Sequence, residues 1–282
     1  MVGCCMDPAK TATQKRLLEK GSAEDCYAFA LQFRESDVQA LQSRVLKIGH
    51  GGTCYAFARD IPGADIAALQ ARVLAIGRGS DCVLFARDVE GADIPALGAR
   101  VLKIGNAKDC LAFAQDVPGA PIESLQARLM KIGTGWDCWQ FARYVPGADV
   151  AALQARVLEI GNGYECGLFA ETVPGADIPA LQARVLEVGD GVNWAAFARN
   201  VPGADRAAIQ RHILQRGTGF VCALFAYEVK GADIKALQDR VLEVGDKKDW
   251  LWFAKKVPGA DKEVLLARAQ ALSDTTETAA PL

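Results

Sequence analysis

The sequence predicts an all-α fold, an α-solenoid of about nine 28-residue helix-turn-helix repeats followed by a C-terminal capping helix. The dipeptide Phe-Ala recurs every 28 residues from Phe29 to Phe253, and a glycine recurs with the same period from Gly21 to Gly245. The register contains no insertion, and no segment shows the apolar–polar alternation of a half-buried strand. Because one helical hairpin cannot cover its own apolar face, neighbouring hairpins must stack to bury it.

The repeat can be followed along nearly the whole chain. Residues 1–8 and 273–282 lack the period and are expected to be disordered. One solenoid domain is expected between them, over residues 9–272. Its hairpins are expected at 9–36, 37–64, 65–92, 93–120, 121–148, 149–176, 177–204, 205–232 and 233–260, and its capping helix at 261–272.

Residues 65–92 represent the first helix of the repeat, helix A. It is expected to begin after Asp65, whose carboxylate can accept hydrogen bonds from the free N–H groups of the first turn. It is expected to end at Gly77 in a left-handed conformation. Apolar residues between these two recur at helical spacing and are expected to form the buried face: Ile66, Leu69, Val73 and Ile76.

The second helix, helix B, is expected to be capped by Asp81 and stopped by a proline that recurs from Pro62 to Pro258. Seven of the nine cysteines share one position of this helix, and Trp194 and Trp250 occupy it in other repeats. Since tryptophan cannot replace a metal ligand or a disulfide partner, this row is interpreted as apolar core. The expected buried face of the representative helix B comprises Cys82, Phe85, Ala86 and Val89.

This arrangement resembles the α-hairpin solenoids, a class that includes tetratricopeptide, HEAT and TAL-effector-like arrays. The resemblance covers nearly the whole chain and is one of architecture. The tetratricopeptide Trp-Leu-Gly-Tyr pattern is missing, and so is the longer repeat unit of TAL arrays. No functional residue can therefore be transferred from any of these families.

Composition and motifs argue against several classes of function. The net charge of −2 and the pI of about 5.8 provide no overall basic field for nucleic acid or anionic membranes. Neither a signal peptide nor a transmembrane segment is recognisable, so a cytoplasmic protein without a membrane partner is expected. No metal site or cofactor is expected, because metal-ligand spacings and phosphate-binding glycine loops are missing. Polar residues recur as rows rather than converging on one place, so the protein is predicted not to be an enzyme.

An arginine recurs at one position of helix A, with His212 as the exception. Two interpretations of this row stay open. The guanidinium groups could contact a phosphate backbone, or each could bind helix-end carbonyls or an aspartate of the adjacent hairpin. Surrounding acidic residues favour the structural interpretation, and a parallel glutamine row is interpreted as a link between repeats. The arginine row includes Arg44, Arg72, Arg100, Arg128, Arg156, Arg184 and Arg240.

Variation between repeats concentrates on helix B, in three rows that contain Gly52, Tyr55 and Arg59. Their spacing predicts one exposed stripe on the side of helix B away from the cysteine and phenylalanine rows. Exposed Trp, Tyr and Arg are enriched at binding hot spots. The alternative is that Trp139 packs between hairpins and Trp136 covers a loop. The candidate binding residues are Trp136, Trp139, Arg143, Tyr144, Tyr164 and Phe220.

The leading functional hypothesis is a non-enzymatic scaffold that binds a protein or peptide along the variable face of the second helices. The alternative is a modular nucleic-acid-binding array that uses the arginine row, which the net charge disfavours. A third hypothesis is a self-assembling structural rod.

Overall fold

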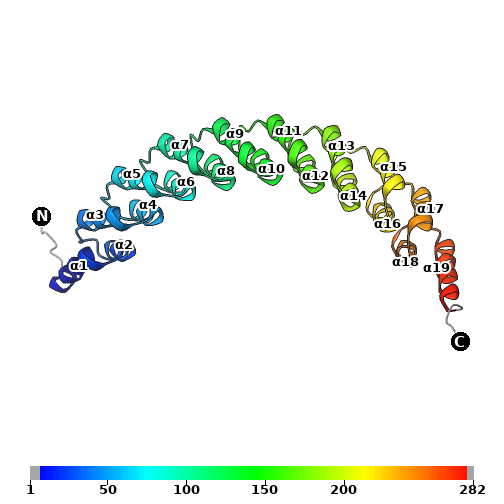
Figure 1. Cartoon of the computed structure of the whole chain (residues 1–282), viewed down its shortest axis with the longest axis horizontal. Coiled ribbons are helices and arrows are strands. Elements are labelled where there is room, and N and C mark those ends of the chain that lie inside the picture. The colour runs from blue at the N-terminus through cyan, green and yellow to red at the C-terminus, as the bar shows by residue number, and fades with distance from the viewer. Residues whose placement is uncertain (1–6, 278–282) are drawn as a thin grey trace. The chain divides into compact units, whose positions relative to one another are not determined.

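The computed structural model describes residues 7–277, and within this range it contains nineteen helices and no strand (Figure 1). The all-α repeat fold is confirmed, with odd-numbered helices as helix A and even-numbered helices as helix B. The helices are α1 (Pro8–Lys20), α2 (Ala23–Gln32), α3 (Val38–Ile48), α4 (Gly51–Asp60), α5 (Ile66–Ile76), α6 (Gly79–Asp88), α7 (Ile94–Ile104), α8 (Ala107–Asp116), α9 (Ile122–Ile132), α10 (Gly135–Tyr144), α11 (Val150–Ile160), α12 (Gly163–Thr172), α13 (Ile178–Val188), α14 (Gly191–Asn200), α15 (Arg206–Arg216), α16 (Gly219–Glu228), α17 (Ile234–Val244), α18 (Lys247–Lys256) and α19 (Lys262–Glu277).

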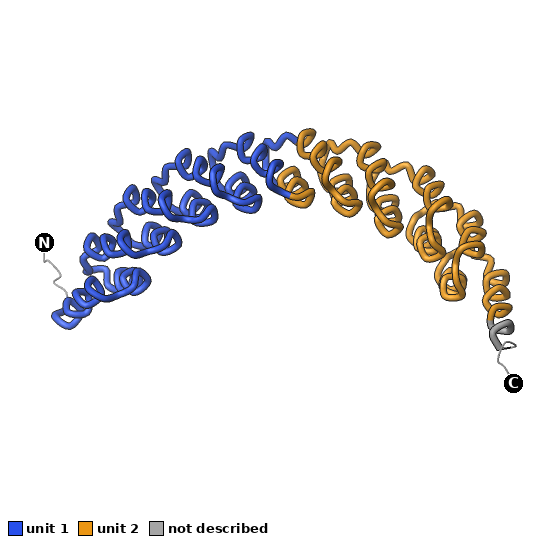
Figure 2. The backbone as a smooth tube through the Cα atoms, in the orientation of Figure 1, with its two compact units in different colours: residues 1–133, 144–149 blue, residues 134–143, 150–282 orange. Residues whose placement is uncertain are grey.

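The chain divides into two compact units, residues 1–133 with 144–149 and residues 134–143 with 150–282 (Figure 2). The division falls within the hairpin expected at 121–148. Inside each unit, most B helices pack most extensively against the A helix that follows and also contact the next B helix, whereas α14 contacts the next B helix, α16, more than it contacts α15. Inside each unit, the apolar face of a hairpin is therefore covered by the next hairpin, as the stacking argument requires.

Helix A begins as predicted but ends differently. The Asp65 side chain accepts a hydrogen bond from the N–H of Ala68, three residues along the helix. Gly77 has an extended backbone with φ of −67°, so the predicted left-handed conformation is wrong at this row. A side chain is excluded there instead, because a Cβ would lie 2.5 Å from the Val73 carbonyl oxygen. The left-handed glycines form a different row, which begins at Gly63 and turns the chain from helix B into the next helix A.

The N-cap of helix B lies three residues before the position that the sequence predicts. At the start of this helix, the N-cap residue and the residue three positions later hydrogen-bond to each other. Asp81 is not the N-cap; its carboxylate accepts the backbone N–H of Arg78, which precedes the helix. In α8 the N-cap Asn106 also accepts the N–H of Asp109, which completes a capping box. The aspartate row therefore does stabilise the start of helix B, but from the third helical position.

The buried face of helix A is narrower than predicted. Leu69 and Val73 are fully buried, while Ile76 and its equivalents in other repeats are exposed. Gln70 is buried in place of Ile76, because its side chain links two repeats. Its Oε1 atom accepts the N–H of Asp93, the N-cap of the next helix A, at 2.8 Å. The predicted link through the glutamine row is confirmed by the same contact from Gln42, Gln126, Gln154, Gln182, Gln210 and Gln238.

The predicted buried face of helix B is confirmed, and the cysteine row has an additional role. Cys166 Sγ lies 3.9 Å from the carbonyl oxygen of Val157, nine residues earlier in helix A. Trp194 occupies the same row, and its Nε1–H donates to the corresponding carbonyl of Val185 at 3.0 Å. Cysteine and tryptophan are therefore exchangeable here as buried groups that both carry a donor.

Both ends of the described range extend beyond the predicted solenoid. Asp7 caps α1, and Pro8 is its first residue. The capping helix α19 continues to Glu277, five residues past its expected end at 272. Predictions for residues 1–6 and 278–282 lie outside the described residues.

Candidate functional site

The outer face of helix B is formed by two of the three variable rows, not by all three. The rows of Gly52 and Arg59 are partly or fully exposed along the described hairpins. The row between them lies, inside each unit, in the interface between successive B helices, where Tyr55, Val83 and Trp139 are buried; on the last B helix, α18, its member Leu251 is exposed. The prediction of one exposed stripe made of all three rows is therefore wrong. The row of Tyr55, three residues after the exposed row of Gly52, faces the next B helix instead of solvent.

Four exposed apolar side chains follow one another along this face in the second unit. They occupy the row of Gly52 on α10, α12, α14 and α16, where the first unit has Gly52, Ser80 and Lys108. We call this set the apolar ridge. Its members and their exposed fractions are Trp136 (39%), Tyr164 (58%), Val192 (51%) and Phe220 (49%).

The aromatic residues at the start of the ridge contact one another. The Trp136 ring lies 4.6 Å from the Trp139 ring, and 6.4 Å from the nearly parallel Tyr164 ring, centroid to centroid. Trp139 itself is only 7% exposed, and its Nε1–H donates to Thr172 Oγ1 at 2.8 Å. The structure therefore places Trp139 in the packing position that the alternative interpretation gave it. Trp136 remains exposed above it.

The other candidates from the sequence are exposed. Arg143 lies on the outer face of α10, and Phe220 lies on α16 at the far end of the ridge. Tyr144, at the C-terminal end of α10, is 47% exposed and belongs to the first unit. Trp136, Tyr164 and Phe220 thus share one row, whereas Trp139 supports that row from below.

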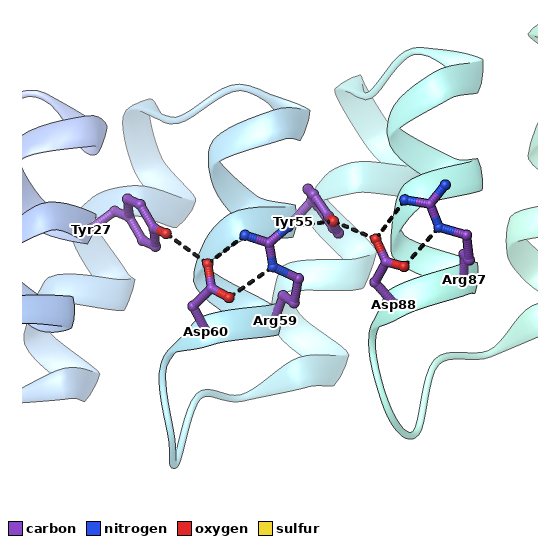
Figure 3. A network of polar contacts seen from close by, with 6 residues as sticks. All are labelled: Tyr27, Tyr55, Arg59, Asp60, Arg87 and Asp88. Atoms are coloured by element: carbon purple, nitrogen blue, oxygen red, sulfur yellow. Dashed lines mark hydrogen bonds and ion pairs between the residues drawn. The ribbon is translucent and has the colours of Figure 1, made fainter.

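In the first unit the same face carries a polar network instead (Figure 3). Tyr27 and Tyr55 each donate their hydroxyl to an aspartate 33 residues later, Asp60 and Asp88. Arg87 donates two hydrogen bonds to Asp88. The arginine and the tyrosine hydroxyl lower the pKa of Asp88 to about 2. Since these charges are already paired, this face offers little for a charged ligand.

Several arginines of the helix A row make the helix-end carbonyl contacts that the structural interpretation expects. Arg44 donates to the carbonyl oxygen of Gly21, at the end of the preceding helix A, at 3.2 Å. Arg128 donates to the equivalent Gly105 at 3.1 Å, and Arg72 to Gly49 at 3.4 Å. Arg100 and Arg184 donate to carbonyls near the end of the preceding helix A. Arg156 and Arg240 instead pair with a glutamate three residues along their own helix, which the interpretation did not predict. Each guanidinium therefore has a partner within the chain.

The described residues show neither a metal site nor a reactive thiol. Among the side chains that the structure describes within residues 7–272, no three His, Cys, Asp or Glu groups are close enough to hold a metal ion. The cysteine row is buried and free of disulfides. Burial raises the pKa of Cys82 and Cys166 to about 11, which disfavours the nucleophilic thiolate. Within the same range, no helix combines the length and apolarity needed to cross a bilayer.

Comparison with known proteins adds no relative: no protein-family model, curated protein or solved structure matches the chain. The class of protein, an all-α helical-repeat array, is thus defined by the fold alone.

Proposed function

We propose that the protein is a non-enzymatic scaffold whose second unit binds a peptide segment of a partner protein along the apolar ridge. The observation that carries the proposal is the succession of four exposed apolar side chains on neighbouring B helices, Trp136 to Phe220. Large exposed apolar surface on a folded protein is typical of interaction sites. Tryptophan and tyrosine are also the residues most enriched among binding hot spots.

The dimensions of the ridge suit an extended segment. Neighbouring packed helices lie about 8–10 Å apart, so three intervals span about 24–30 Å. An extended chain advances about 3.3 Å per residue, which gives a ligand of about seven to nine residues. Polar residues of the Arg59 row flank the ridge and would form the rim of such an interface.

A nucleic-acid array receives less support, because the guanidinium groups of the arginine row bind the chain's own carbonyl and carboxylate oxygens. A nucleic-acid ligand would require affinity that falls steeply with salt concentration. Catalysis is not part of the proposal, since the polar groups of the described residues are arranged as repeated structural contacts.

The test is selection of random twelve-residue peptides on the full-length protein, followed by fluorescence anisotropy with the selected sequences. We expect Trp136→Ala with Phe220→Ala to weaken the selected peptides at least tenfold, about 1.4 kcal/mol. The matched control is Ile160→Ala with Val188→Ala, which removes similarly exposed apolar side chains from A helices of the same unit. Equal loss in both double variants, or failure to select any peptide, would refute the proposal. Binding of single-stranded DNA or RNA at low salt, without peptide binding, would establish the nucleic-acid alternative.

A further inference from the structure

The buried row of helix B lacks a side chain at one position. In α4, α6 and α10 this row places a Tyr, Val or Trp between successive B helices of one unit. In α12 the residue is Gly167. A Cβ built on Gly167 would meet only Phe197 Cδ2, at 3.9 Å, so the space in front of it is open.

This open space forms a groove between α12 and α14, which we call the Gly167 groove. Its volume is about 360 Å³, counting the part open to solvent. The apolar wall is provided by Leu168, Phe197 and Val201, and the rim by Tyr164, Glu171 and Asn200. The groove opens beside Tyr164, so it adjoins the apolar ridge.

The preceding hairpin shows what fills the equivalent space. Between α10 and α12 it is occupied by the Trp139 ring, which donates its N–H to Thr172 at the end of α12. Trp136 covers that ring at 4.6 Å. Tyr55 and Asp88 in the first unit repeat the pattern, with a phenol in place of the indole (Figure 3).

Each element of this arrangement except the inserted ring is present at the Gly167 groove. The equivalent of Trp136, 28 residues later, is Tyr164, whose 58% exposure fits a cover without a ring beneath it. The equivalent of Thr172 is Asn200, whose Oδ1 accepts from Arg199 Nε at 2.8 Å and whose Nδ2–H donates to Glu171 at 3.3 Å. Glu171 replaces the arginine found at this position on α4, α6, α10 and α14, so the groove ends at a carboxylate acceptor.

We propose that the Gly167 groove is a pocket for a tryptophan or tyrosine side chain of the partner peptide. The inserted ring lies against Leu168 and Phe197 under Tyr164, as Trp139 lies under Trp136. Its indole N–H or phenol O–H donates to the Glu171 carboxylate at the groove's end. This inference rests on the proposed peptide-binding function, and it identifies the peptide's tryptophan or tyrosine as the residue that anchors the peptide in the groove.

The test uses single capped amino acids as probes of the full-length protein, with the methyl groups of Leu168 and Val201 observed by ¹³C NMR. We expect N-acetyl-tryptophanamide and N-acetyl-tyrosinamide to shift both resonances saturably. N-acetyl-phenylalaninamide, which has the ring without the donor, should bind at least threefold more weakly. The corresponding capped leucine and arginine serve as controls without an aromatic ring. The proposal is overturned if the phenylalanine, leucine or arginine probe binds as well as the tryptophan probe, or if no probe shifts these methyl groups.

Two variants locate the binding. Gly167→Leu reproduces the side chain that Leu111 supplies at this position of another repeat, and it should abolish the shifts by filling the groove. Val83→Leu places the same side chain at the same position of a hairpin without the groove, and it should leave the shifts unchanged. Tyr164→Ala changes an exposed side chain and should weaken binding at least threefold even if Gly167→Leu does not fold.

The two proposals can fail separately. If selected peptides depend on Trp136 and Phe220 but bind the Gly167→Leu protein with unchanged affinity, the ridge is supported and the pocket is refuted. If the tryptophan probe enters the groove but no peptide can be selected, the pocket is supported and the peptide-binding scaffold is refuted.

Discussion

Two glycines of α12 should respond in opposite directions to the same substitution. Gly163 begins the helix, and a Cβ there would lie 2.5 Å from Gly189 Cα, a backbone atom that cannot rotate away. Optimal carbon contacts are about 3.5–4.0 Å, so the segments must separate by about 1 Å. Overpacking of this kind costs about 1–3 kcal/mol. Gly167 lies in the helix interior beside open space, and alanine there should stabilise the helix by about 1 kcal/mol.

Gly163→Ala and Gly167→Ala should therefore differ by about 2–4 kcal/mol, with wild type between them. All five tryptophans lie in the second unit, so the urea dependence of tryptophan fluorescence reports the unfolding of this unit. At about 2–4 °C per kcal/mol, thermal midpoints should separate by at least about 4 °C. A neutral or stabilising Gly163→Ala, or a destabilising Gly167→Ala, would refute the close approach at one position and the open groove at the other.

Three further predictions follow from the links between repeats. Because the folded-state pKa of Asp88 is depressed from 3.8 to about 2, its stabilising contribution is complete above about pH 4 and is lost as pH falls toward 2. Asp88→Asn should accordingly lower the thermal midpoint at pH 6 but match wild type near pH 2 by circular dichroism, and a constant difference across this range would contradict the linkage. The thiols of Cys82 and Cys166, with pKa values near 11, should resist iodoacetamide at pH 8 until urea unfolds the protein, as peptide mass spectrometry would show; rapid native labelling would contradict their burial. Deletion of residues 65–92 should leave a folded, shorter array that is more stable than the one left by deleting residues 93–120. After the first deletion, the N–H of Asp93 takes the place of the Asp65 N–H and can donate to Gln42. After the second, Pro121 takes the place of Asp93 opposite Gln70 and has no N–H to donate. Equal circular-dichroism melting of the two deletion proteins would contradict the importance of this link, and deletion of the 14 residues 93–106 should collapse the helical signal.

The repeat length, the helix order and most of the core could be predicted because each depends on residues that recur without insertion. Leu69, Val73, Cys82 and Phe85 have their predicted burial for this reason. Errors arose where the period identifies a row but not its environment. Ile76 has the spacing of a core residue, yet it is the last residue of α5 and is exposed. Asp81 has the chemistry of an N-cap, and only the backbone path shows that it acts from the third helical position.

The candidate site was predictable in part, for a related physical reason. The exposed positions of Trp136, Tyr164 and Phe220 follow from helical periodicity. The burial of Trp139 does not, because a B helix contacts both the next B helix and the next A helix, and the sequence does not state the angle between these contacts. The open groove at Gly167 depends on a missing side chain, which gains meaning only when the space that Trp139 fills in the preceding hairpin is known.

One exception in the chain shows that its recurring contacts constrain residues in pairs. The glutamine that links repeats is replaced once, by Gly98, and the N-cap aspartate that it would meet is replaced by Pro121. Since proline has no N–H, a glutamine at position 98 would be left with a buried acceptor and no donor, which typically costs about 1–3 kcal/mol. The row of Tyr55 behaves differently, since Tyr, Val, Leu, Trp, Ala and Gly all occur in it. Its buried members fill space between B helices, and none of the row is required to complete a backbone hydrogen bond. Variation in this mostly buried row therefore leaves the stack intact while it opens or closes grooves beside the exposed rows. The binding properties of such an array can thus change when a buried side chain becomes smaller, even though that side chain itself contacts no ligand.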